Sequence, residues 1–395
     1  MATTTYKRAR EQRDRAVWIA LGLALAPVIA LGFSRFAYAL LLPPMRDALG
    51  WSFTQAGGMN TANAIGYVIG AATGAWWTKH FSIRGTFLGS LIISSLALLI
   101  TGTTTSYAVL MALRFVGGVA TAVAFVVGSS LAARIRHHLL PVYFAGAGIG
   151  IVLSGIVVPV ALAASGAVGW RIGWLVLGLA ALAALVPAWL AARAVPEHEQ
   201  GHAAGLSGAA FHKLAATFAA YILFGAGYVS YMTFVIALLR AQHLEAWVMV
   251  AFWLVLGMAS AVASLFWGPG LGRLRGGHGM ALVSAIAFVG SLPVLLHAGP
   301  ATALLSAIVF GGSFMAGPTA VTALTRHTLV PRYWTAGIAA LTTAFALGQA
   351  AGPVVSGLLA DRAGGLTIGL WLSPILLALA AGVALLQPHH PHHSE

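Results

Sequence analysis

Two arginines lie where a charged side chain is costly. Arg35 and Arg114 fall well inside long apolar stretches, whereas all eight Asp and Glu residues fall at the termini, in predicted loops or at the edges of such stretches. An ionisable side chain inside a membrane helix costs about 2.5–3.5 kcal/mol on insertion scales, so it is a functional candidate. A guanidinium group matches the two oxygens of a carboxylate or phosphate. Buried cations without buried anions therefore indicate a site for a negatively charged ligand.

Other polar side chains in the apolar stretches could line the same site. Asn60, Asn63 and Tyr67 are spaced at i, i+3 and i+7, which places them on one side of a helix. They can be ligands of a solute or hydrogen bonds between helices, and the sequence leaves both roles open. For the aromatic residues and Gln349, packing is the alternative role. The candidate substrate-binding residues are Arg35, Tyr38, Asn60, Asn63, Tyr67, Arg114, Tyr228, Tyr231 and Gln349.

The elements that position these residues are predicted to be membrane helices. The chain is 59% hydrophobic and 7% charged, far below the charged share of about 25% in soluble domains. A membrane span needs about 20 apolar residues, and runs this long and uniform exclude an alternating barrel pattern. We expect twelve spans, close to 16–42, 54–78, 85–104, 106–133, 141–165, 170–192, 212–239, 246–270, 279–298, 300–328, 333–360 and 366–387.

The basic residues follow the expected topology. The net charge is +13, and with the N-terminus inside, fifteen Lys and Arg fall in inner segments against four in outer segments. The positive-inside rule then predicts cytoplasmic N- and C-termini in the plasma (inner) membrane. The charge is explained by topology, so we expect no nucleic-acid partner. The absence of cysteine removes disulfides and thiolate metal sites, and we expect no cofactor and no metal.

The sequence divides near its midpoint. We expect a cytoplasmic tail at 1–15, a six-helix bundle at 16–192, a polar linker at 193–211, a second six-helix bundle at 212–387 and a tail at 388–395. Large polar groups are missing from the middles of every third span, as in bundles of three-helix repeats. The fifth and eleventh spans share a GxxxGxxxSG pattern, which favours close helix contact or a sliding surface between states. Its residues are Gly146, Gly150, Ser154 and Gly155, and Gly348, Gly352, Ser356 and Gly357.

Several segments resemble the major facilitator superfamily. Arg114-Phe-Val-Gly-Gly118 resembles the superfamily's fourth-helix motif, and Gly169-Trp170-Arg171 resembles its loop signature. Gly348 to Gly357 is similar to its antiporter motif, displaced to the eleventh helix. The segment from Gly32 to Pro43 is similar to the first helix of the uncharacterised YbfB/YjiJ-like branch. The resemblance implies two pseudo-symmetric six-helix bundles that work by alternating access.

The resemblance also implies roles for the two arginines. Anion transporters of the superfamily often place an arginine in the first helix, so we interpret Arg35 as a substrate ligand rather than a structural arginine. The fourth-helix arginine often braces the first helix, so for Arg114 we favour the structural role over the ligand role. One departure is in the loop after the second span, where Thr78 occupies the position of the superfamily's usual acid. The acid on which the superfamily's charged latch depends is therefore absent from this position.

Together these features predict a secondary transporter of a small solute, an organic anion such as a carboxylate, by proton symport or exchange. The alternative is a proton-antiporting efflux carrier for neutral or cationic drug-like compounds. For protons, the candidates are His327, a substrate that carries the proton itself, or Asp47, Glu245 and Asp361, which could instead form loop ion pairs with Arg46, Arg240 and Arg362. No enzyme motif is present, so we expect no enzymatic activity. We expect a monomer whose partners are the solute and the lipid bilayer.

Overall fold

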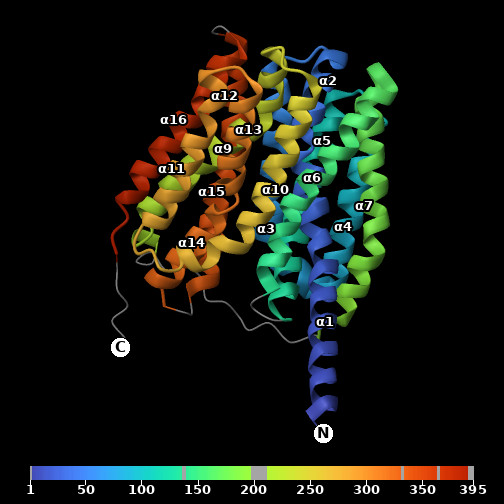
Figure 1. The fold of residues 1–395 in the computed structure, drawn as a ribbon, viewed down its shortest axis with the longest axis vertical. Helices are drawn as coiled ribbons and strands as arrows, with labels where there is room; N and C mark the ends of the chain where they lie inside the picture. Colours follow the sequence, from blue (N-terminus) through green and yellow to red (C-terminus); the bar gives the residue numbers. More distant parts are fainter. Residues whose placement is uncertain (1, 136–138, 197–210, 331–332, 363–364, 390–395) are drawn as a thin grey trace.

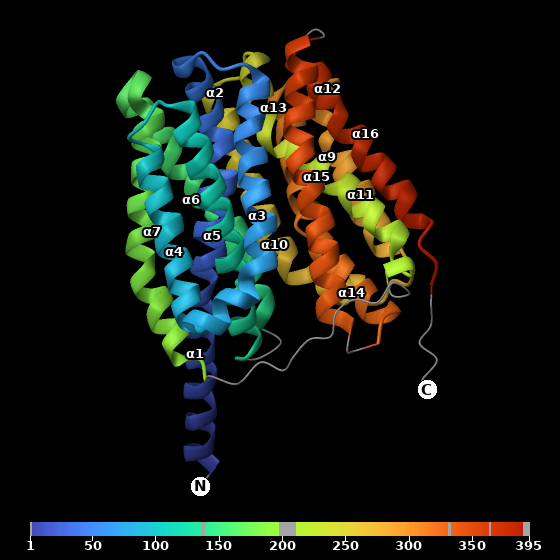
Figure 2. The ribbon, with the colours of Figure 1, turned by 180° about the vertical axis from the view of Figure 1, so that it is seen from behind.

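The computed structural model describes residues 2–135, 139–196, 211–330, 333–362 and 365–389, and nearly all of them are helical. Figures 1 and 2 show the helices side by side in one elongated bundle. In chain order they are α1 (Ala2–Pro27), η1 (Val28–Phe36), α2 (Tyr38–Leu49), α3 (Phe53–Phe81), α4 (Ile83–Thr101), α5 (Tyr107–Ala133), α6 (Leu140–Ser165), η3 (Gly166–Val168), α7 (Gly169–Ala194), α9 (Ala215–Ala241), α10 (Ala246–Leu271), α11 (His278–Ser291), α12 (Pro293–Leu296), α13 (Pro300–Phe314), α14 (Gly317–Thr328), α15 (Trp334–Arg362) and α16 (Leu366–Leu385).

The expected class of fold, an all-helical membrane protein, is confirmed. Within the described ranges, ten helical stretches are long and apolar enough to cross a membrane. One of them, Leu140–Ala194, is 55 residues long and contains both α6 and α7. The expected linker at 193–211 and the tail at 388–395 lie largely outside the described residues.

The first expected span, 16–42, differs most from its prediction. The chain is nearly continuously helical from Ala2 to Leu49. The middle part of this stretch, η1, is a π-helix of nine residues. The π-helix starts directly after Pro27, which has no backbone N–H to give to the helix. Such π segments are rare and are frequently found at functional sites. This one carries Arg35 in its last turn.

Two expected spans are interrupted by prolines. The stretch 300–328 forms α13 and α14, and Pro318 is the second residue of α14. The stretch 279–298 forms α11 and the short α12, which begins at Pro293. Proline is tolerated in the first turn of a helix because its missing N–H would have no partner there. The hydropathy pattern does not register these breaks because the flanking residues stay apolar.

Helices α1 to α7 form the part of the chain that we call the first half, and α9 to α16 form the second half. The largest contacts between the halves are α3 with α15, α6 with α10 and α2 with α9. By contrast, α4, α7, α11 and α16 have their main contacts within their own half, and both views place them at the edges of the bundle. These are the spans that lack large polar groups in their middles.

The glycine pattern of α6 produces the close contacts that its spacing predicts. A Cβ on Gly150 would lie 2.8 Å from the Cα of Gly32 in η1, so the two backbones almost touch. A Cβ on Gly155, the last residue of the pattern, would lie 2.9 Å from Cδ1 of the Trp253 side chain in α10. Helix α6 therefore packs tightly on η1 in its own half and on α10 in the other half.

The matching pattern of α15 has an equivalent role. A Cβ on Gly352 would lie 2.3 Å from the carbonyl oxygen of Ala226 in α9, within the second half. A Cβ on Gly357 would lie 2.5 Å from the carbonyl oxygen of Phe53 in α3, across to the first half. Each repeat thus makes close contacts both within its own half and with the other half. Close helix contact is confirmed for both repeats.

Candidate functional site

The side chain of Arg35 bridges the two halves at the centre of the bundle. It is 6% exposed, and its Nη2 donates a hydrogen bond of 2.7 Å to Oε1 of Gln349 on α15. Its guanidinium lies 5.3 Å from the ring centroid of Tyr67 on α3. Both contacts are made to neutral groups. Among the described residues, the positive charge is therefore held by an amide oxygen and an aromatic face.

Gln349 also forms a hydrogen bond to a third helix, α9. Its Nε2 donates a hydrogen bond of 2.8 Å to the hydroxyl of Tyr228 on α9, and the Gln349 side chain is fully buried. We call Arg35, Gln349 and Tyr228 the Arg35 chain. It runs from η1 in the first half to α15 and α9 in the second half.

Aromatic rings surround the Tyr228 end of this chain. The Tyr228 ring stacks at 5.5 Å on Phe345 of α15 and at 5.6 Å on Phe314 of α13, and Phe36 of η1 meets Phe314 edge-on at 5.7 Å. Tyr221, about two helical turns before Tyr228 on α9, also stacks on Phe345. Sequence reasoning missed Phe314 and Phe345, because a phenylalanine in an apolar stretch looks the same whether it packs in a core or beside a site.

Arg114 is held differently. Its Nη1 donates to the backbone carbonyl of Ser34, and its Nε donates to the carbonyl of Met59 at 3.4 Å. Its Nη2 donates to Oδ1 of Asn60 at 2.7 Å, and its guanidinium lies 4.8 Å from the Tyr38 ring centroid. All these partners belong to the first half. Arg114 therefore ties α5 to η1, α2 and α3, which is the bracing contact expected of a structural arginine.

Asn60 extends the Arg114 contact into the second half. Its Nδ2 donates a hydrogen bond of 2.7 Å to Oγ1 of Thr233 on α9. We call Arg114, Asn60 and Thr233 the Arg114 chain. Thr233 was absent from the candidates predicted from the sequence, although it follows Tyr228 by five residues on the same helix. Both chains thus start at an arginine of the first half and end on α9.

The remaining candidates lie beside these chains or away from them. Asn63 donates to the backbone carbonyl of Arg114 at 3.2 Å, and the Tyr38 hydroxyl donates to the carbonyl of Ala56 at 2.8 Å. Tyr231 differs, because its hydroxyl bonds to Oγ of Ser306 and its ring packs 4.2 Å from that of Phe310. The structure brings Arg35, Tyr67, Gln349 and Tyr228 together and directs Tyr231 into the second half.

Anionic side chains are kept away from this centre. Within the described ranges, neither Arg35 nor Arg114 forms a salt bridge, and the five described carboxylates are all exposed. The same ranges hold no cluster of three His, Asp or Glu side chains that could bind a metal ion. The buried centre is therefore positively charged and has no fixed counter-ion in the described part of the chain.

Asp47 lies near the end of α2 and Asp361 near the end of α15, and the two carboxylates bind different partners. Asp47 forms ion pairs with Arg46 at 3.7 Å and with Arg240 of α9 at 3.0 Å, as the loop-pair interpretation expects. Asp361 instead accepts hydrogen bonds from the backbone nitrogens of Phe53 and Thr54 at 2.9 and 2.8 Å. It caps the first turn of α3 across the boundary between the halves. Ionic attraction to Arg362 is thus replaced by binding to free N–H groups at a helix start.

Known proteins resemble this chain over all or part of its length. A chloramphenicol resistance protein of Streptomyces lividans is 27% identical over 384 residues, which cover 92% of this chain and 95% of that protein. A probable sulfoacetate transporter, SauU, of Cupriavidus necator is 28% identical over 178 residues, which cover 44% of this chain and 40% of that protein.

Solved structures share the fold. A bacterial homologue of the human lysosomal transporter Spinster superposes with a TM-score of 0.72 at 15% identity, covering 94% of this chain and 97% of that chain. The nucleoside transporter NupG gives a TM-score of 0.69 at 15% identity, with the same coverage of 94% and 97%. At such low identity the likeness concerns the fold alone.

The helical membrane bundle and these likenesses define the class of protein, a multi-pass membrane transporter of the major facilitator type. Within that class, the chain belongs to the family described as uncharacterised MFS-type transporter YbfB, whose model matches residues 27–385. The resemblance inferred from the sequence motifs is thereby confirmed.

Proposed function

We propose that this protein is a secondary active transporter that carries a small organic anion, a carboxylate, by alternating access. In this proposal twelve spans cross the plasma membrane with both termini in the cytoplasm. They are the ten candidate stretches, with α6 and α7 counted separately, together with α3. The spans form two six-helix bundles at 16–192 and 212–387, joined by the linker at 193–211. The protein works as a monomer.

The observation that carries the proposal is the contact between Arg35 and Gln349. A buried guanidinium bonded to a neutral amide is incompletely compensated, because an amide oxygen carries a partial charge whereas a carboxylate supplies a full opposite charge. A carboxylate ligand would be a better partner for Arg35 than Oε1 of Gln349. Arg35 and Gln349 come from different halves and are 2.7 Å apart, so an anion that takes the place of Gln349 acts at the boundary between the halves.

The Arg35 chain links ligand binding to rearrangement. When an anion displaces the Gln349 amide, the hydrogen bond between Gln349 and the Tyr228 hydroxyl is free to reorganise. A ligand shifts a conformational equilibrium only by its difference in affinity for the two states. Here that difference arises because the ligand and the Gln349 amide compete for the same guanidinium. Binding of the ligand therefore breaks the hydrogen bond that joins the two halves.

One relative supports an anionic substrate. The probable sulfoacetate transporter SauU matches 178 residues of this chain, and sulfoacetate is itself an organic anion. For energy coupling, we propose either exchange of one anion for another or symport with a proton that the substrate carries as a neutral acid. Both routes avoid the need for a buried protein carboxylate.

The efflux of neutral or cationic drug-like compounds is the second candidate function. Two observations favour it: the stacked rings of Tyr221, Tyr228, Phe314 and Phe345, and the relative named as a chloramphenicol resistance protein. An aromatic wall binds apolar compounds and, through its ring faces, cations. The buried charge of Arg35 opposes cationic cargo in the same space.

Transport into proteoliposomes tests the proposal. Purified protein is reconstituted, and uptake of labelled sulfoacetate, short mono- and dicarboxylates, and chloramphenicol is measured with and without an imposed pH gradient. We expect uptake or counterflow of at least one anion, with chloramphenicol at the level of protein-free vesicles. Uptake of chloramphenicol with no movement of any anion would favour the efflux function instead.

A further inference from the structure

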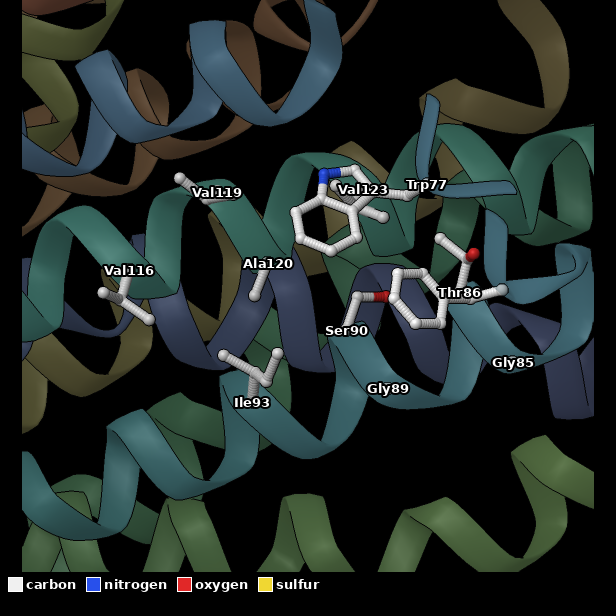
Figure 3. A pocket seen from close by; sticks show the side chains of 11 residues that line it. Trp77, Gly85, Thr86, Gly89, Ser90, Ile93, Val116, Val119, Ala120 and Val123 are labelled. Carbon is white, nitrogen blue, oxygen red and sulfur yellow. The ribbon is translucent and has the colours of Figure 1, made fainter. Parts of the chain in front are cut away.

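A lateral groove on the first half is separate from the central chains. It has a volume of about 430 Å³ and lies between α3, α4 and α5 (Figure 3). Its walls are apolar, and the lining residues Ile93 and Val116 are 47% and 44% exposed. In a membrane-spanning chain, exposed apolar surface at this level faces the lipid chains. The groove is therefore open to the bilayer rather than to water.

One polar group in the groove has no hydrogen-bond partner among the described residues. Thr86 is 6% exposed and lines the groove, and its hydroxyl is the group without a partner. Figure 3 shows it on α4, below the Trp77 indole of α3. A buried hydroxyl without a partner costs about 1–3 kcal/mol, so it points to a ligand that brings an acceptor. Ser90, the other hydroxyl in the groove, is satisfied by the carbonyl of Phe87.

The position of Thr86 along the helix matches the chemistry of a phospholipid. Helix α3 ends at Phe81 and α4 begins at Ile83, so Thr86 lies in the first turn of α4, close to the end of the bundle. The groove continues along α4 to Ile93, about 10 Å further at 1.5 Å per residue. A phospholipid has the same order of groups, with ester carbonyls just below the headgroup and an acyl chain beyond them.

Charge near the groove selects the headgroup. Lys79 lies in the last turn of α3, and residues 74–93 contain no Asp or Glu. Basic side chains at a membrane surface attract anionic lipids with about 1 kcal/mol each. We propose that this groove is a binding site for an anionic phospholipid, whose acyl chain fills the groove and whose ester carbonyl accepts a hydrogen bond from Thr86. With the proposed topology, the lipid belongs to the inner leaflet.

Gly89 allows a direct test. It lines the groove, and a Cβ added there would meet nothing within 4 Å, so the side chain of Gly89→Leu starts from open space in the groove. Gly382 on α16 is a matched control, since its Cβ would also meet nothing and it lies outside the groove. Thr86→Val removes the hydroxyl at nearly constant shape. All three variants are compared with the full wild-type chain.

Lipid retention is measured by native mass spectrometry of detergent-purified protein incubated with phosphatidylglycerol and phosphatidylcholine of the same acyl chains. We expect the wild type to prefer phosphatidylglycerol by about fivefold, as about 1 kcal/mol of headgroup attraction gives. We expect Gly89→Leu to retain about tenfold less of it, and Thr86→Val about fivefold less, as loss of one hydrogen bond gives. Gly382→Leu should match the wild type.

The proposal is overturned if monodisperse Gly89→Leu protein retains phosphatidylglycerol as the wild type does, or if the wild type retains both lipids equally. An equal loss in Gly382→Leu would also overturn it, because the effect would then belong to any added bulk on the membrane face. None of these measurements depends on transport. Their outcome is therefore independent of whether the proposed substrate is correct.

Discussion

The two buried arginines lie in the same half and are held in opposite ways. Arg114 donates to two backbone carbonyls and to Asn60, all in its own half. Arg35 donates to one neutral side chain, Gln349, in the other half. Backbone carbonyls cannot leave a helix, whereas a glutamine side chain can rotate away. The difference teaches that burial of a charge does not by itself mark a ligand-binding residue; the replaceability of its partner does.

Replacing Arg114 should have the largest effect, and it should fall on stability. Arg114→Ala leaves the carbonyls of Ser34 and Met59 and the amide oxygen of Asn60 without their charged donor. Hydrogen bonds to charged groups contribute about 1.5–3 kcal/mol each, so we expect a loss of about 3 kcal/mol or more. Thermal unfolding of the purified protein, followed by tryptophan fluorescence, measures it. A melting curve equal to the wild type would remove the bracing role.

Replacing Arg35 should instead fall on transport. Arg35→Gln keeps a polar group near Gln349 and removes the charge. Truncating one partner of a buried charged contact costs about 2–5 kcal/mol, so we expect transport of the anion to drop by at least about 30-fold. The thermal midpoint should change far less than in Arg114→Ala. Uptake into proteoliposomes at matched protein density measures the first effect. Normal transport by Arg35→Gln would contradict the assignment.

An internal carboxylate should imitate the substrate. Gln349→Glu places an anion on the side chain that already contacts Arg35, and an ion pair replaces a hydrogen bond between a charged donor and a neutral acceptor. We expect a rise in stability of about 1 kcal/mol, together with loss of anion transport, because the guanidinium is now occupied. Gln349→Ala, which leaves Arg35 without this acceptor, is the matched variant and should destabilise. The idea is lost if Gln349→Glu transports as well as the wild type.

The smallest effect should come from Tyr228. Tyr228→Phe keeps the stacking on Phe345 and Phe314 but removes the hydroxyl that accepts from Gln349. One such hydrogen bond contributes about 1 kcal/mol, so we expect about a fivefold weaker apparent affinity for the anion. Tyr231→Phe is the comparison, because Tyr231 bonds to Ser306 instead. If both variants weaken affinity equally, the Arg35 chain has no special role.

The helical character of the apolar stretches followed from the sequence because hydropathy is a local property, and ten stretches in the described ranges are long and apolar enough to cross a membrane. The class of fold and the family followed as well, through motifs such as Arg114 to Gly118. The glycine repeats predicted close contact correctly, since only small residues allow backbones to approach in this way. The partners of the glycines, Gly32 and Ala226 among them, needed the three-dimensional arrangement.

The hydrogen bond between Arg35 and Gln349 could not be predicted from the sequence. Arg35 and Gln349 are 314 residues apart, and no spacing rule joins them. The π-helix that carries Arg35 is invisible to a hydropathy pattern, because it changes the hydrogen bonding of the helix and not its composition. Tyr231 differs from Tyr228 by three positions, and only packing against α13 shows that it serves another contact.

A thermal-shift experiment tests most directly whether the guanidinium of Arg35 binds the transported anion. Wild type and Arg35→Gln are melted with a panel of sulfoacetate, mono- and dicarboxylates, and chloramphenicol. We expect at least one anion to raise the melting temperature of the wild type and this stabilisation to disappear in Arg35→Gln. Stabilisation of both proteins by the same anion to the same extent, or of the wild type by chloramphenicol alone, would contradict it.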